Sequence, residues 1–76
     1  MTYYLIQTES GMQRSVVAGT AEHAEKWRCG GVVRELTDEE TERLLDDVPI
    51  AHQFFGYEIN TVDIEYVLTG DREETH

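Results

Sequence analysis

Cysteine and long apolar runs are scarce in this 76-residue sequence. The single cysteine, Cys29, excludes an intramolecular disulfide framework and a cysteine-based zinc site, and it fits a reducing compartment. No stretch approaches the roughly 20 apolar residues of a membrane-spanning helix. The opening segment MTYYLIQT also lacks the basic residues and apolar core of a secretory signal. We therefore expect a soluble, cytoplasmic protein.

Signatures of catalysis and of cofactor binding are also missing. The chain contains no G-x-S-x-G, P-loop or G-x-G-x-x-G motif, and its acids lack the D-x-D-x-D-G spacing of a calcium loop. His23 and Cys29 lie six residues apart in one predicted helix, at about 100° per residue, so they point to opposite faces. We therefore expect a protein that is not an enzyme and has no cofactor or metal site.

Positive charge is scarce as well, with 6 Lys and Arg against 16 Asp and Glu and a net charge of −10. Residues 1–37 are neutral overall, so the whole excess lies in residues 38–76. Nucleic acids and anionic membranes attract Lys and Arg, and an acidic chain is unsuited to bind either directly. The charge therefore predicts a basic protein as the partner.

The first half of the chain predicts strands and one helix. Alternating apolar residues indicate strands over 2–8, 12–19 and 32–36, with a turn at Glu9–Gly11. Thr20 is a suitable N-cap for a helix that ends before the pair Gly30-Gly31. In that helix the residues expected to face the sheet are Ala21, Ala24 and Trp27.

The second half predicts a helix over 38–47 and a further strand. Thr37 and Glu40 form a T-x-x-E capping box. An apolar stripe follows at helical spacing, namely Thr41, Leu44, Leu45 and Val48. After Pro49, residues 49–55 predict either a short helix or a loop that runs into a strand. Residues 57–68 predict a strand whose alternation slips near Asn60, so that a bulge or turn is needed there.

These elements predict a small single-domain α+β fold in the order ββαβαβ. We expect an antiparallel sheet with two helices packed on one face. A chain of this length buries only somewhat more than about 60% of the surface that its unfolded state exposes, so the core must be small. Residues 1–69 form the predicted domain, and residues 70–76 are a polar tail that we expect to be frayed.

The helix over 38–47 is the candidate functional site. It holds six acids and one base in a length of about 15 Å, which is one net negative charge per about 3 Å. A DNA strand carries one phosphate per about 3.4 Å. The helix dipole disfavours acids in the last turn, so local stability does not explain them. The predicted partner-binding residues are Asp38, Glu39, Glu42, Asp46 and Asp47, extended by Asp63 and Glu65 on one strand face, with Tyr57 as an aromatic anchor.

Such a surface predicts an inhibitor whose carboxylates mimic phosphates in the groove of a basic, nucleic-acid-handling protein. In its small size, acidity and lack of catalytic motifs, the chain resembles phage-encoded inhibitors of restriction or CRISPR effector complexes, and also some antitoxins. The resemblance rests on composition, and it implies action in the cytoplasm of the host cell. The alternative is a general interaction or adaptor module in which the acids serve solubility and an aromatic such as Tyr3, Tyr4 or Tyr57 makes the contact. A homodimer is compatible with either.

Overall fold

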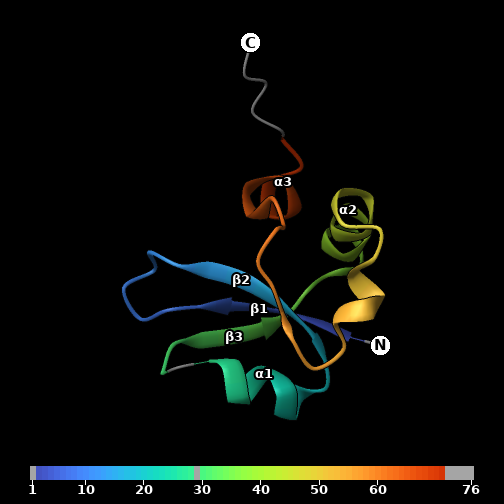
Figure 1. Cartoon of the computed structure of the whole chain (residues 1–76). Helices are drawn as coiled ribbons and strands as arrows, with labels where there is room; N and C mark the ends of the chain where they lie inside the picture. Colours follow the sequence, from blue (N-terminus) through green and yellow to red (C-terminus); the bar gives the residue numbers. More distant parts are fainter. Residues whose placement is uncertain (1, 29, 72–76) are drawn as a thin grey trace.

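A four-stranded antiparallel sheet in the order β3-β1-β2-β4 organises this computed structural model, which describes residues 2–28 and 30–71 (Figure 1). The fold class predicted from the sequence, a small α+β domain with helices against an antiparallel sheet, is confirmed. The strands are β1 (Thr2–Gln7), β2 (Arg14–Gly19), β3 (Val32–Glu35) and β4 (Glu58–Ile59). The helices are α1 (Ala21–Trp27), α2 (Asp38–Asp47), the short 3-10 helix η1 (Ala51–Phe54) and α3 (Ile64–Thr69).

The two central strands present apolar side chains on both faces of the sheet. Leu5 of β1 lies opposite Val16 of β2, and both pack in the larger core with Leu44 and Val67. The alternate positions, Ile6, Tyr4 and Val17, pack in a second, smaller core with Ala24 and Trp27 from α1. The sheet is therefore covered on both sides.

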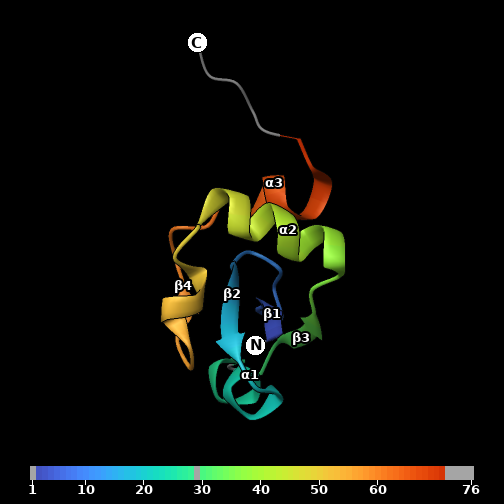
Figure 2. The ribbon, with the colours of Figure 1, turned by 90° about the vertical axis from the view of Figure 1, so that its right-hand side faces the viewer.

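Helices lie on both faces of the sheet. The two helices predicted from the sequence, now α1 and α2, were expected to share one face, and this expectation is wrong. Helices α2 and α3 cover one face, and α1 covers the other (Figures 1 and 2). The physical reason is that the central strands carry apolar side chains on the second face too, and these need a cover. Beneath α1, Ile6 and Val17 are only 4% and 0% exposed. Ala21, which was predicted to face the sheet, is exposed, whereas Ala24 is buried.

Both longer helices begin where their capping residues predict. The Thr37 side chain accepts a hydrogen bond from the backbone N–H of Glu40, and the Glu40 carboxylate accepts one from the N–H of Thr37. Thr20 and His23 form the equivalent box at α1. These reciprocal bonds satisfy backbone donors that the first helical turn leaves without partners.

The strand predicted over 57–68 is wrong beyond Ile59, and with it the bulge near Asn60. Only Glu58 and Ile59 pair with β2, after which the chain leaves the sheet. The Asp63 side chain accepts a hydrogen bond from the N–H of Tyr66 and so starts α3. The apparent slip in alternation was a change of period, because Ile64, Val67 and Leu68 pack together at helical spacing against the larger core.

Helix α3 ends at Gly70, whose φ of 81° lies in the left-handed region that glycine adopts without strain. Of the tail predicted to be frayed, residues 72–76 lie outside the described part of the chain. Within residues 2–28 and 30–71, no helix has the length and apolar character required to cross a membrane.

Candidate functional site

The acids of α2 divide between the two sides of the helix. Its inner side carries Leu44 and Val48, which are 0% and 7% exposed, together with the buried Glu40. The outer side exposes Asp38, Glu42 and Asp46 at a spacing of four residues, with Glu39 beside them. Residues at this spacing lie above one another on a helix. We call these four exposed residues, Asp38, Glu39, Glu42 and Asp46, the acidic face of α2.

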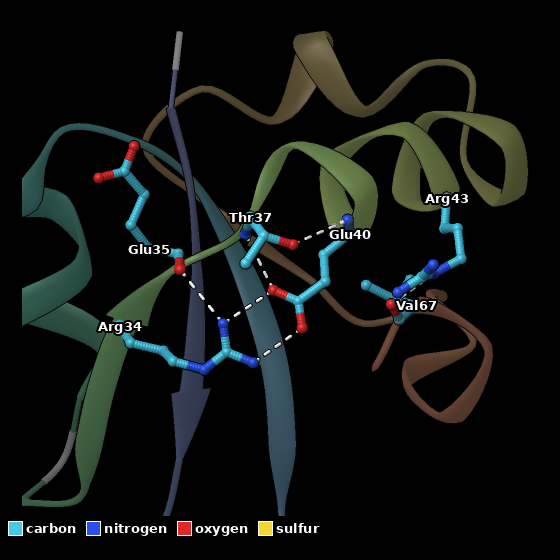
Figure 3. Close-up of polar contacts among 6 residues, drawn as sticks. All are labelled: Arg34, Glu35, Thr37, Glu40, Arg43 and Val67. Atoms are coloured by element: carbon cyan, nitrogen blue, oxygen red, sulfur yellow. Dashed lines mark hydrogen bonds and ion pairs between the residues drawn. The ribbon is translucent and has the colours of Figure 1, made fainter. Parts of the chain in front are cut away.

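Two nearby arginines direct their guanidinium groups to Glu40 and to Val67 (Figure 3). Arg43, the base within α2, donates through Nε to the carbonyl oxygen of Val67 in α3 at 2.8 Å. Arg34 of β3 donates through both terminal nitrogens to the two carboxylate oxygens of Glu40, each at 2.8 Å. Arg34 and Arg43 are close to these acids in sequence, but their guanidinium groups bind groups inside the fold.

Glu40 is the acid of α2 that serves the fold. The hydrogen bonds from Arg34 lower the pKa of the Glu40 carboxyl to about 2, and the Thr37 N–H acts in the same direction against the opposing effect of burial. The same pair raises the pKa of Arg34. Glu40 was not among the predicted partner-binding residues. Of the five that were predicted on α2, four form the acidic face, and the fifth, Asp47, is half-buried.

The C-terminal end of α2 meets the start of α3. The carboxylate of Asp47 accepts a hydrogen bond from the N–H of Asp63 at 2.7 Å. The Tyr66 hydroxyl donates to Asp46 at 2.9 Å. The structure thus brings Asp63 next to the acidic helix, but as the cap of α3 and not as part of a strand face. The sequence analysis did not identify Tyr66 as a site residue, because it predicted a strand where Tyr66 lies in α3.

Glu65 does not share a face with Asp63 in the way that the predicted strand required. It lies in the first turn of α3 and forms an ion pair with Arg14 of β2. A carboxylate that is neutralised by a neighbouring guanidinium adds little to an anionic surface. Glu65 is therefore the predicted site residue whose position least favours its expected role.

Tyr57 is exposed, as its predicted role requires, but it belongs to another part of the surface. Its side chain is 65% exposed, whereas Tyr3 is 6% exposed and Tyr4 is half-buried. The backbone carbonyl oxygen of Tyr57 accepts a hydrogen bond from the N–H of Ala18 at the β4 edge of the sheet. The neighbouring Phe55 is 50% exposed and contacts the ring of His23 edge-on, with ring centres 5.0 Å apart. The aromatic and acidic features thus form two separate candidates.

The described residues contain no group of three or more His, Cys, Asp or Glu side chains arranged to hold a metal ion. Comparisons with models of protein families, with characterised proteins and with solved structures found no match to this chain. The geometry and charge of the surface are therefore the basis for assigning a function.

Proposed function

We propose that this protein is a non-enzymatic inhibitor that binds a basic, nucleic-acid-handling protein in the cytoplasm. Its carboxylates would occupy a groove that otherwise holds phosphates. The observation that carries the proposal is the acidic face of α2, where four carboxylates are exposed on one side of a helix. The arginines at positions 34 and 43 are meanwhile bonded to Glu40 and Val67.

The spacing of these carboxylates supports phosphate mimicry. From Asp38 to Asp46 the helix rises about 12 Å, so the four acids of the face supply one charge per about 3–4 Å. One DNA strand presents one phosphate per about 3.4 Å of its axis. Asp63 lies beside the end of this row through its bond to Asp47, and it lengthens the anionic surface beyond α2. A groove lined with Lys and Arg would meet a similar charge density on either ligand.

The fold also holds the acidic face in a fixed position. Leu44 and Val48 are buried against the sheet, and the bond from Arg43 to Val67 ties α2 to α3. A partner therefore does not have to order the backbone that carries the charges, which lowers the entropic cost of binding. The arrangement favours a protein that competes with nucleic acid through a preformed surface.

Neutralising the acidic face tests the proposal. Immobilised protein with Asp38, Glu39, Glu42 and Asp46 changed to Asn or Gln should lose at least about tenfold in affinity for the partner that the wild type retains from host lysate. The captured partner should be a nucleic-acid-binding protein that added DNA or RNA displaces. Binding should also weaken steeply between about 50 mM and about 200 mM salt.

A matched control removes four charges from other exposed positions, namely Glu9, Glu22, Glu35 and Asp71. This variant has the same net charge as the first, and it should bind the partner as the wild type does. Equal capture by wild type and both variants would show that the acidic face is only a solvated surface. Equal loss in both variants would show that net charge, and not phosphate mimicry by α2, attracts the partner.

A second candidate function is favoured by the exposed aromatics. Phe55 and Tyr57 are half or more exposed next to the β4 edge, and large exposed aromatic side chains are typical anchors of protein interfaces. In this case the protein is a general interaction module, and its acids provide solubility. Tyr57→Ala and Phe55→Ala would then reduce capture of the partner more than neutralising the acidic face does.

A further inference from the structure

A groove of about 490 Å³ lies on the face of the sheet that α1 covers only in part. Helix α1 has seven residues and a length of about 10 Å, whereas the six-residue strands beneath it extend for about 20 Å. Ile6 and Ser15 line the groove from the sheet, Trp27 and Arg28 from the end of α1, and Glu58 from β4. Its volume is in the range of ligand pockets, about 300–1,000 Å³.

The groove includes a part of the β2 edge with which β4 does not pair. Strand β4 pairs with β2 only at Val16 and Val17. The N–H of Ala18 donates to the backbone carbonyl of Tyr57, so it points to the β4 side of β2. Because backbone groups alternate in direction along a strand, those of Arg14, four residues earlier, also point to the β4 side. They lie beyond the end of β4, where Arg14 lines the groove. An extended segment of another protein can add to such an edge through its backbone.

Both arginines that line the groove form ion pairs with carboxylates outside it. Arg14 pairs with Glu65, and Arg28 pairs with Glu25 at 3.3 Å. The partly buried carboxylate of Glu58 accepts a hydrogen bond from the Ser15 hydroxyl at 2.9 Å, which supplies no positive charge. Within the part of the chain that the structure describes, no Lys or Arg lies within ion-pair distance of Glu58. Glu58 is thus the charge in the groove without a counter-charge.

Trp27 provides an aromatic wall of the same groove. Its indole Nε1 donates to the carbonyl oxygen of Gly56 at 3.0 Å, and the side chain packs against the smaller core of Ile6, Val17 and Ala24. The ring is therefore fixed in place. Guanidinium groups bind both partners well, because they stack on indole rings and donate two parallel hydrogen bonds to a carboxylate.

We propose that this groove binds an arginine side chain from an extended segment of a partner protein. The guanidinium lies against Trp27 and bonds to Glu58, while the segment's backbone follows the edge of β2 at Arg14, beyond its pairing with β4. The site is on the opposite face of the sheet from α2 and α3, so the inference stands apart from the function proposed for the acidic face.

Titration of the full-length, ¹⁵N-labelled protein with two peptides tests this inference. The probes are acetyl-Ala-Ala-Arg-Ala-Ala-amide and the same peptide with neutral citrulline in place of arginine. The arginine peptide should shift the NMR signals of the Trp27 indole N–H, Ser15 and Glu58 saturably. The citrulline peptide should bind about tenfold or more weakly, since the ion pair with Glu58 is lost. Trp27 is the only tryptophan, so its fluorescence gives a second readout.

The variant Glu58→Gln keeps the shape of the side chain and should weaken the arginine peptide about tenfold, towards the citrulline value. Glu22→Gln removes the same charge from an exposed position on α1 outside the groove, and it should leave the affinity unchanged. Three outcomes would overturn the inference: equal affinity for both peptides, shifts confined to α2 and α3, or no saturable shift at millimolar peptide. A Glu58→Gln protein that binds like the wild type would also overturn it.

Discussion

Replacing Leu44 with alanine should lower the free energy of unfolding by about 3–5 kcal/mol, because it opens a cavity where α2 joins the larger core. Leu44 is 0% exposed and packs in the same core as Val16 of the sheet and Val67 of α3. A domain of this length has a total stability of only about 4–11 kcal/mol, so this loss is a large fraction of the whole. Urea denaturation followed by far-ultraviolet circular dichroism measures the difference.

Leu45→Ala is the matched control for this prediction. It removes the same atoms from the adjacent position of the same helix, where the side chain is 39% exposed. The intrinsic helix propensities of leucine and alanine differ little, so this variant should lose less than about 1 kcal/mol. Equal losses at the two positions would contradict the placement of Leu44 on the inner side of α2.

The contrast between these two leucines bears on how α2 can carry its charge. Carboxylates four residues apart on one helix face repel one another by a few tenths of a kcal/mol per pair. Asp38, Glu42 and Asp46 form two such pairs on the outer side of α2. Burial of the inner side against the sheet and α3 opposes this repulsion. The helix that carries the acidic face is thus stabilised by tertiary packing, and not by interactions among its own side chains.

Local signals predicted the start of each helix in the first two thirds of the chain, because a capping residue acts on backbone groups only a few positions away. Thr20 and Thr37 are examples, and both cap as predicted. In the last third of the chain the predicted strand over 57–68 was wrong, because β-forming residues such as Tyr66 and Val67 lie in a helix. A local signal was present, because Asp63 caps α3 and Ile64, Val67 and Leu68 recur at helical spacing, but the β-forming residues around it favoured a strand.

In the candidate site, too, features that depend on local spacing were predicted, and features that depend on distant residues were not. Helical spacing alone was enough to predict that Asp38, Glu42 and Asp46 would share the outer side of α2. The position of Arg43 was not predictable, since its partner Val67 is 24 residues away in a helix that the sequence did not reveal. The groove lined by Trp27 was not predictable either, because it depends on how far α1 and β4 extend along the sheet.

The Arg34–Glu40 pair gives the second large effect, and this effect depends on pH. The pKa of Glu40 falls from its ordinary value of 4.5 to about 2 in the folded protein. Because folding lowers this pKa, the stabilisation is fully present above about pH 5 and is lost as the pH falls through the range from 4.5 to 2. Glu40→Gln removes the charge and should lower the free energy of unfolding by about 2 kcal/mol at neutral pH.

This figure is lower than the full pKa difference would suggest, because water screens part of the interaction. The Arg34 side chain is 46% exposed although that of Glu40 is 8% exposed. The stability difference between wild type and Glu40→Gln, measured by urea denaturation at several pH values, should shrink towards zero near pH 2. Glu42→Gln is the control, since it removes an exposed charge between Asp38 and Asp46 and should stabilise slightly at neutral pH. A difference for Glu40→Gln that stays constant from pH 7 to about pH 2 would show that the ion pair is not its origin.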